Sequence, residues 1–351
     1  MGKVEALPIV GMVMAECAQV GLMIVSKAAM SDGMSNLVFV FYSNALAALI
    51  LLPLSLFFHR SERPPLTFLI VSGFFLLGVL GFLAQFFGYA GINYSSPTLG
   101  TALLNLIPAI TFIFAVALRM EKLDWKSSST FAKSMGTIVS ISGAFIVTLY
   151  KGPQLFTNSP ASSLSYTLLF SQQSNWVLGG LLLGADCVAA SAWLIVQAPI
   201  LKRYPAELIV VFFYCFFVTI LSAVTCLVME RDPSAWSLKP KTRFMAVLYS
   251  AVFGSAFQVS VSTWCLQKTG PVFVSMFKPV GIVIAFAAGV IFLGDTFYLG
   301  RLIGAIVIVV GFYSVMWGKA KEAKTDMDDG VSSLESSGQR TPFLQNSAEE
   351  T

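Results

Sequence analysis

The sequence predicts an all-α membrane protein in which ten transmembrane helices form a five-plus-five inverted repeat. Its composition is strongly apolar: 56% of the 351 residues are hydrophobic, 11% are charged, and the mean hydropathy is +0.78. Soluble globular domains carry about 25% charged residues, so this composition excludes an ordinary soluble protein. The apolar residues form ten stretches, each close to the roughly 20 residues that cross a bilayer as a helix. The last five stretches repeat the first five.

The predicted spans follow one another with short polar breaks between them. The first span keeps polar residues and lacks the short basic pattern of a signal peptide, so we expect it to remain as an anchor. The ten spans cover approximately residues 7–29, 37–58, 66–90, 98–118, 133–150, 176–200, 207–229, 243–265, 271–293 and 299–317. They divide the chain into a first repeat (1–150), an extramembrane linker loop (151–174), a second repeat (175–318) and a disordered cytoplasmic tail (319–351). The tail begins with a basic patch that suits anionic lipid headgroups, and its Ser-rich, acidic remainder is typical of disorder.

The repeat consists of residue matches that keep their order along the chain, at offsets of 168 to 174 residues. The matched pairs are Glu16 and Asp186, Lys27 and Gln197, Gly81 and Gly254, Gln85 and Gln258, Pro97 and Pro271, Glu121 and Asp295, Gly136 and Gly304, and Gly143 and Gly311. Five spans is an odd number, so the second half enters the membrane from the opposite face. The two halves are then related by an axis in the membrane plane, an architecture typical of secondary transporters.

The distribution of basic residues predicts the orientation. With both termini in the cytoplasm, the cytoplasmic segments hold thirteen Lys and Arg residues and the opposite side holds seven. This excess follows the positive-inside rule. We therefore expect both termini to be cytoplasmic and the linker loop to lie on the other side.

Two acids lie near the middle of apolar spans, where a charge costs about 2.5–3.5 kcal/mol on insertion scales. On a helix, Glu16 shares a face of the first span with Gln19, and Asp186 shares the matching face of the sixth span with Trp193. We expect these four residues to line a solute cavity. The alternative for each acid is a structural role with a neighbouring Lys or hydroxyl, and the alternative for Trp193 is aromatic packing.

Two further spans combine a polar residue with a helix-breaking proline. Lys278 lies seven residues past Pro271, so it is about 10 Å deep by helical rise. Pro279 follows it and removes a helical hydrogen bond, as Pro108 does close to Asn105 in the fourth span. A cation beside freed backbone groups predicts an anion site. Asn105, beside the comparable break in the fourth span, is a further candidate substrate residue. The alternatives for Lys278 are snorkelling to the headgroups or a structural ion pair.

Gln85 and Gln258 are repeat-related amides, each four residues after a glycine. Such amides often bond across a helix interface, and we favour this role over contact with a solute. Gln258 nevertheless remains a candidate substrate residue. The glycine pairs 136/143 and 304/311 are each seven residues apart and predict seams where helices pack closely.

The sequence offers no catalytic or metal-binding pattern. All five cysteines lie inside predicted spans, the one histidine, His59, lies at a loop edge, and no HExxH pattern occurs. We therefore predict no enzyme activity, no metal and no cofactor, and no nucleic-acid partner.

Several motifs resemble one plant family. These are NLIPAITF (105–112), RMEKLD (119–124), GPVFVSMFKP (270–279) and FLGDTFYLGRLIGAIVIVVGFYSVMWGK (292–319). They are similar to the nodulin-type, walls-are-thin-related transporters (UMAMITs), which have two EamA domains and belong to the drug/metabolite transporter superfamily. The resemblance implies ten helices around a central cavity and transport of amino acids, or of auxin in some members. It also implies the plasma membrane, with the vacuolar membrane as the alternative.

The predicted function is a carrier that moves small organic solutes by alternating access, with amino acids as the first choice. Lys278 would take the solute carboxylate, Asp186 or Glu16 would take its ammonium group, and one acid could also carry a proton. The alternatives are a carrier of auxin or another small organic anion, and a passive channel. An intramembrane enzyme fits less well, because the sequence shows no metal cluster and no nucleophile with a base. A receptor fits less well, because it requires no second, inverted half.

Overall fold

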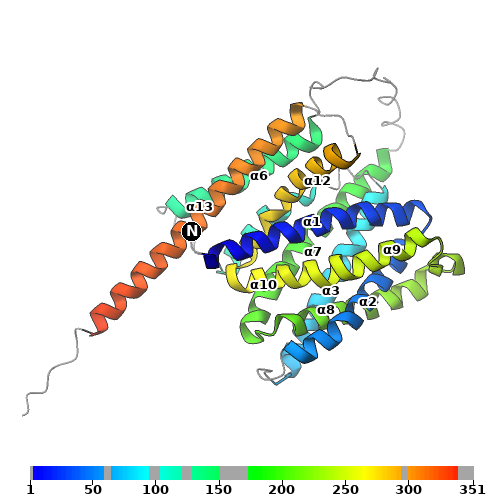
Figure 1. Cartoon of the computed structure of the whole chain (residues 1–351), viewed down its shortest axis with the longest axis horizontal. Helices are drawn as coiled ribbons and strands as arrows, with labels where there is room; N and C mark the ends of the chain where they lie inside the picture. Colours follow the sequence, from blue (N-terminus) through cyan, green and yellow to red (C-terminus); the bar gives the residue numbers. More distant parts are fainter. Residues whose placement is uncertain are drawn as a thin grey trace, which may run out of the picture.

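The chain folds into a bundle of long apolar helices. The computed structural model describes residues 3–58, 65–94, 103–120, 128–150, 173–293 and 299–338, and within these ranges it contains no strand. The helices of the first half are α1 (Lys3–Ser31), α2 (Asn36–Phe58), α3 (Phe68–Tyr94), α5 (Ile107–Ala117) and α6 (Ser128–Leu149). Those of the second half are α7 (Gln173–Arg203), α8 (Glu207–Met229), η1 (Pro233–Trp236), α9 (Lys241–Tyr249), η2 (Ser250–Gln258), α10 (Val259–Thr269), α11 (Pro271–Ser275), α12 (Phe277–Leu293) and α13 (Leu299–Gly338). Figure 1 shows their arrangement.

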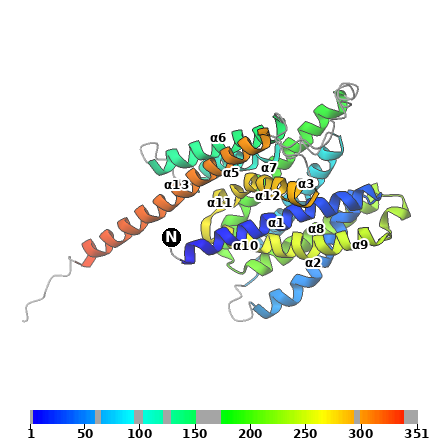
Figure 2. The same ribbon diagram turned by 45° about the horizontal axis from the view of Figure 1, so that its top comes forward.

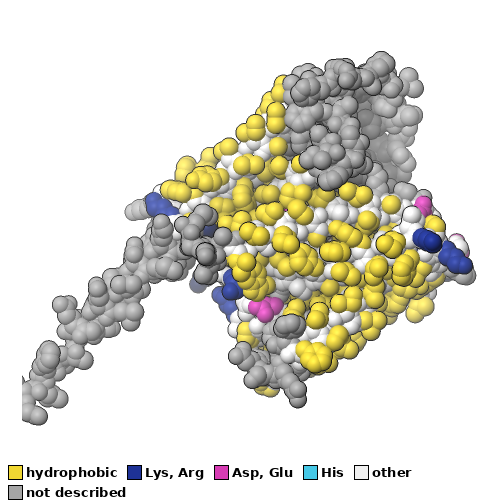
Figure 3. Space-filling view, viewed as in Figure 1, with side chains coloured by type: hydrophobic (Ala, Val, Ile, Leu, Met, Phe, Trp, Pro, Cys, Tyr) yellow, Lys and Arg dark blue, Asp and Glu magenta, His cyan; other side chains and the backbone are white. Residues whose placement is uncertain are grey.

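The surface and the helix lengths are those of an integral, multi-pass membrane protein. Seven segments of the described chain are long and apolar enough to cross a membrane: 7–30, 36–57, 68–91, 177–203, 207–229, 241–269 and 302–321. Two shorter apolar helices, Ile107–Ala117 and Pro271–Ile284, lie where the fourth and ninth spans were predicted. Hydrophobic side chains cover most of the face in Figure 3, and its charged side chains gather at two opposite ends. The total of ten spans stays a prediction.

The fourth and ninth predicted spans are both interrupted, as their prolines indicate. In the fourth, a turn at Asn105 and Leu106 precedes α5, and Pro108 occupies the first turn of that helix. In the ninth, α11 ends before Met276, and Pro279 occupies the first turn of α12. A proline in a first turn costs little, because the N–H groups there have no helical partner. The two interrupted helices pack against each other through α5 and α11.

The eighth predicted span is a continuous helix with an unusual centre. α9 passes directly into η2, a π-helical segment, and then into α10. Helices of this wider type are rare, and they occur often at functional sites. η2 carries both repeat-related residues of this span, Gly254 and Gln258. Its glycine allows close approach, since a Cβ there would lie 2.9 Å from the side chain of Leu22 on α1.

The packing of helices in one half corresponds to that in the other half. α3 packs on α7, and the corresponding helix of the second half, formed by α9, η2 and α10, packs on α1. α5 packs on α7 just as α12 packs on α1, while α2 packs on α8 and α6 packs on α13. Each predicted span of the first half has a counterpart at the same place in the order of the second half. When both helices of a contact are replaced by their counterparts, the result is again one of the contacts named here.

α6 and α13 lie side by side at one edge of the bundle in Figures 1 and 2. A Cβ on Gly136 would lie 2.7 Å from the carbonyl oxygen of Gly311, and a Cβ on Gly143 would lie 2.9 Å from that of Gly304. Only glycine permits such contacts, so the predicted close-packing seam is confirmed. The later glycine of α6 meets the earlier glycine of α13, which means that the two helices run antiparallel.

α13 is longer than the tenth predicted span. The composition predicts a disordered tail from residue 319, whereas the structure continues the helix to Gly338. The physical reason is local, because residues 319–324 are Lys, Ala and Glu, which have high helix propensity. The remaining tail residues 339–351, most of the linker loop (151–172), Pro97, Glu121 and Asp295 lie outside the described residues.

Candidate functional site

An ion pair between the two halves lies inside the bundle. Nζ of Lys278 on α12 lies 3.0 Å from Oε1 of Glu16 on α1, to which it donates a hydrogen bond. The Glu16 side chain is 3% exposed, whereas the Lys278 side chain keeps 29% of its surface exposed. A charge on an apolar helix is costly unless it is paired. The structure therefore brings together two of the predicted site residues, which are 262 positions apart in sequence.

The second acid lies close to the same cation. Asp186 on α7 is buried, and its carboxylate interacts electrostatically with the ammonium group of Lys278. Tyr89 on α3 also lies within electrostatic range of that carboxylate. Lys278 thus lies within electrostatic range of both repeat-related acids, one from each half, and among the described residues its printed ion pair is with Glu16. We call Glu16, Asp186 and Lys278 the charged cluster.

Two glycines make room for the carboxylates of the charged cluster. A Cβ on Gly281 of α12 would lie 2.7 Å from Oε2 of Glu16. Similarly, a Cβ on Gly88 of α3 would lie 2.8 Å from Oδ2 of Asp186. Real Cβ contacts are almost never this short, so any larger residue would displace the carboxylate. Both glycines and Tyr89 escape prediction from the sequence, since nothing in one sequence indicates which helix faces each acid.

A group of polar and aromatic side chains joins α2, α3, α7 and α8. The Gln85 amide donates to the Tyr214 hydroxyl over 3.1 Å and accepts from the Asn44 amide at 3.4 Å. These bonds agree with the cross-helix role favoured for Gln85. The Trp193 ring lies against that of Tyr214, with centroids 5.4 Å apart. Its buried indole N–H finds no acceptor among the described residues.

The remaining predicted site residues are more dispersed. Asn105 is buried at the turn before α5, in the interrupted fourth span. Two side chains of α7 donate hydrogen bonds to carbonyl groups of this span. Cys187 donates to the Leu103 carbonyl at 3.1 Å, and Ser191 donates to the Ile107 carbonyl at 3.2 Å.

Gln19 and Gln258 are half-buried. Neither makes a hydrogen bond to another predicted site residue within the described part of the chain. The structure therefore brings Glu16, Asp186 and Lys278 together, and it does not join these two amides to them.

One buried charge was missed. Lys133 on α6 is 1% exposed and packs beside Gly318 of α13. Lys133 is one of the thirteen basic residues that were assigned to the cytoplasmic side from the sequence, because it is the first residue of the fifth predicted span. Its burial follows from the close approach of α6 and α13.

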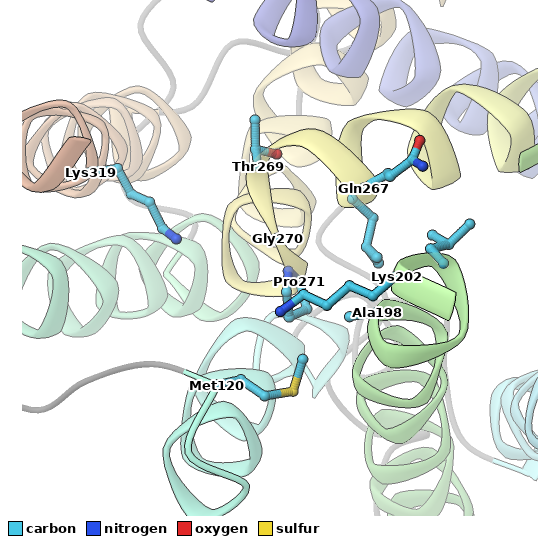
Figure 4. A pocket seen from close by; sticks show the side chains of 10 residues that line it. Met120, Ala198, Lys202, Gln267, Thr269, Gly270, Pro271 and Lys319 are labelled. Atoms are coloured by element: carbon cyan, nitrogen blue, oxygen red, sulfur yellow. The ribbon is translucent and has the colours of Figure 1, made fainter. Parts of the chain in front are cut away.

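A cavity of about 220 Å³ lies at the end of the bundle, away from the charged cluster. None of the seven predicted site residues lines it, although all seven are described. Figure 4 shows this cavity where α7, α10, α11 and α13 come together. Elsewhere in the described residues, no group of three or more His, Cys, Asp or Glu side chains could hold a metal ion.

Comparison with known proteins identifies related sequences along nearly the whole chain. The EamA-like transporter family matches residues 8–149 and 177–317. Two WAT1-related proteins of Arabidopsis thaliana are each 46% identical to the chain, one over 97% of this chain and 96% of its own length, the other over 91% and 88%. A third, also from Arabidopsis thaliana, is 45% identical over 92% of this chain and 91% of its own length. A solved crystal structure superposes with a TM-score of 0.65 at 15% identity, covering 90% of this chain and 98% of that one.

Proposed function

The chain belongs to the EamA-like transporter family, in its plant WAT1-related group, and from this premise we propose that it is a carrier of amino acids that works by alternating access. The family is one of membrane transporters of small solutes. What remains to be assigned is the solute, the working residues and the mechanism. The charged cluster is the observation that carries the proposal.

The composition of the charged cluster suits a zwitterion. It contains two carboxyl groups and one ammonium group, contributed by α1, α7 and α12. A solute carboxylate could bind Lys278, whose side chain is 29% exposed and therefore reachable, in place of Glu16. The solute ammonium group would then interact with the released acid or with Asp186. An anion without an ammonium group would leave both acids without that partner, so the cluster favours amino acids over auxin.

Four other residues complete the proposed site. Asn105 lies at the interruption of the fourth span, the counterpart of the interruption that Lys278 follows in the ninth. Trp193 offers a buried indole N–H without an acceptor among the described residues, and an aromatic face. Gln19 and Gln258 are half-buried amides on α1 and η2. We assign the binding of solute carbonyl or side-chain atoms to these four residues.

Alternating access requires two halves that can exchange roles. The helix contacts of one half correspond to those of the other, and α6 and α13, which exchange with each other, run antiparallel. A two-fold axis that exchanges antiparallel helices is perpendicular to them, hence in the membrane plane. These contacts support a five-plus-five inverted repeat of ten spans, with repeats at 1–150 and 175–318 joined by the loop 151–174. We place both termini in the cytoplasm and the protein in the plasma membrane, with the vacuolar membrane as the alternative.

Efflux of a labelled amino-acid mixture from oocytes tests the proposal. Wild type should release label saturably, and unlabelled amino acid outside should accelerate the release, which a passive channel would not do. Asp186→Asn should reduce the flux to a small remainder of the wild-type value at unchanged surface expression. Asp232→Asn is the matched control, because Asp232 only caps η1 through Ser234 at the exposed surface. If wild type reaches the surface and moves no amino acid, the amino-acid proposal fails and auxin and other organic anions become the next substrates to test.

Proton coupling is tested in the same assay. If an acid of the charged cluster carries a proton, Glu16→Gln or Asp186→Asn must change the pH dependence of whatever flux remains. A pH profile identical to that of wild type in both variants excludes the proton role while leaving the carrier proposal standing.

A further inference from the structure

The turn between α1 and α2 is fastened to the start of α9 by the side chains of two adjacent residues. The Thr242 hydroxyl donates to the Asp32 carboxylate, and the Arg243 guanidinium donates to the Asp32 backbone carbonyl. The same guanidinium donates to the Ser237 carbonyl at 3.1 Å and to the Ser234 carbonyl at 3.5 Å. Asp32 belongs to the first half, and the other four residues belong to the second. We call the bonds of Thr242 and Arg243 to Asp32 the latch.

Aromatic packing joins the two halves beside the latch. The Trp236 ring of η1 lies edge-on to the rings of Phe41 and Tyr42 on α2, with centroids 5.8 and 6.2 Å apart. The Tyr42 hydroxyl also donates to the Trp236 carbonyl at 3.2 Å. At Gly33, where φ is +87°, a Cβ would lie 3.1 Å from the Arg243 guanidinium. The halves are thus closed on each other at this end of the bundle, the outer end in the orientation proposed above.

The latch holds one end of α9, and the other end of α9 passes into the π-helical segment η2. Sharp bends in helices often occur at π-helical segments. Beyond η2, α10 packs closely on the beginning of α1. A Cβ on Gly11 would lie 3.2 Å from Val261, and the Cys265 thiol donates to the Pro8 carbonyl at 3.5 Å. This arrangement allows α9 to change direction at η2 while α10 stays in place on α1.

α9 and η2 cover the part of α1 between the charged cluster and the latch. α1 packs on both of them, and α9 lies beside α1 in Figures 1 and 2. Tyr249, the last residue of α9, donates from its hydroxyl to the Ala18 carbonyl at 3.4 Å and would collide with a Cβ on Gly21. Ala18 follows Glu16 by two positions on α1, so Tyr249 lies close to the level of the charged cluster. The segment that the latch holds therefore extends from the outer surface to that level.

The latch is built from bonds that can break at low net cost. They lie at the exposed surface, so water can replace each partner, and an exchange of this kind changes the free energy little. The Nε–H group of Arg243 is buried without an acceptor among the described residues. An unpaired buried donor costs free energy, which offsets part of what the other bonds of this guanidinium contribute.

We propose that the latch is the outer gate of the carrier. Closed, as in this structure, it holds the α1–α2 turn of the first half on α9 of the second half. Open, it lets α9 bend away at η2 and gives a solute on the outer side access to the charged cluster. This inference rests on the carrier proposal and on the orientation stated with it. It adds the residues that decide whether the site faces the outer side.

Labelling of a reporter cysteine on intact oocytes tests the gate without any transported solute. The reporter is Gln19→Cys, one turn after Glu16 on α1, in a Cys17→Ser background, because Cys17 is exposed whereas the other four cysteines are buried. A membrane-impermeant, positively charged thiol reagent is added outside. Arg243→Gln should raise the labelling rate about tenfold or more, as expected for loss of a charged hydrogen-bond donor. Thr242→Val should raise the rate less, and Thr242→Ser, which keeps the hydroxyl, should leave it unchanged.

Arg231→Gln is the matched control, because it removes the same charge from the same outer surface. Arg231 is exposed in the loop before η1 and takes no part in the latch. Its loss should leave the labelling rate within about twofold of the parent at equal surface expression. The proposal fails if Arg243→Gln and Thr242→Val are labelled no faster than the parent, or if Arg231→Gln accelerates labelling as much as they do.

A disulfide across the latch tests whether the latch must open during transport. Asp32→Cys combined with Thr242→Cys places two thiols where the two side chains now bond. Oxidation should arrest amino-acid efflux and reduction should restore it, while Thr242→Cys alone keeps its efflux under the same oxidation. Full efflux through the oxidised pair, with the crosslink confirmed by mass spectrometry, would overturn the gate. If wild type moves no amino acid, the carrier proposal fails, and the labelling rates still decide whether the latch closes the outer side.

Discussion

Removing Lys278 should destabilise the protein more than removing its partner Glu16. Lys278→Met leaves a carboxyl group with a 3% exposed side chain in the bundle, without its 3.0 Å ion pair. Breaking a buried pair in this way costs about 3–5 kcal/mol. Glu16→Gln instead leaves an ammonium group on a side chain that is 29% exposed. That residual cation is less buried than Glu16 and keeps a second acid within electrostatic range, so we expect a loss of only about 1–2 kcal/mol.

The double variant makes the prediction quantitative. Lys278→Met combined with Glu16→Gln removes both charges and keeps both side-chain shapes, so its loss should be well below the sum of the two single losses. The coupling free energy should reach about 1–3 kcal/mol, the range measured for residues in one ion-pair network. Gly184→Ala with Lys278→Met is the control pair, because a Cβ at Gly184 contacts nothing within 4 Å. Its effects should be additive.

Apparent melting temperatures of the purified proteins in one detergent provide the assay. Domains of 150–250 residues lose about 2–4 °C per kcal/mol, and a larger protein loses less, so Lys278→Met should lower the melting temperature by about 5 °C. Glu16→Gln should lower it by about half as much. Equal losses in the two single variants, or strict additivity in the double variant, would refute the reasoning from unequal burial.

Three further predictions concern the scaffold. Gly311→Ala should lower the free energy of unfolding by about 1–3 kcal/mol, because the new Cβ would clash with backbone atoms of Ser140 on α6 that cannot rotate away. The measurement is the melting temperature, and an unchanged value would contradict close packing of α6 on α13. Gly184→Ala alone should raise stability by up to about 1 kcal/mol, since alanine is the better helix former and the site is open; a clear loss would mean that the space is occupied in solution. Tyr214→Phe should lower the free energy of unfolding by about 1 kcal/mol, because it removes the acceptor of the Gln85 amide, and it should leave flux per molecule unchanged. A loss of flux without a loss of stability would instead place Gln85 and Tyr214 in the solute site.

The positions of seven long spans and of two shorter apolar helices were predictable from the sequence, because each is specified by residues close together in the chain. Apolar length predicts a crossing helix, and Pro108 and Pro279 predict the interruptions that the structure contains. The length of α13 and the burial of Lys133 were less accessible. The length of α13 depends on whether the helix continues beyond the point where the composition changes from apolar to polar. The burial of Lys133 depends on which helix packs against that point.

The charged cluster was only half predictable. The cost of a charge in an apolar span singled out Glu16, Asp186 and Lys278 one at a time, and this argument needs no partner. Which of them pair depends on helices that are 262 residues apart in the chain. The repeat suggested that Glu16 and Asp186 occupy related positions, but it gave no partner for either, because Lys278 belongs to only one half.

In the carrier proposed above, that asymmetry would give a duplicated fold a specific site. The repeat contributes one acid from each half, and it places an interruption in both the fourth and the ninth span. At one interruption the polar residue is Asn105, and at the other it is Lys278. One cation between two acids cannot obey the two-fold exchange, so at any moment it must favour one of them, and in this structure it favours Glu16.

Transfer of Lys278 from Glu16 toward Asp186 would break an α1–α12 contact and form an α7–α12 contact. An Asp186→Asn variant, which removes the second acceptor, should therefore hold the protein in the Glu16-paired state, and crosslinks between α1 and α12 should then form at equal yield with and without solute.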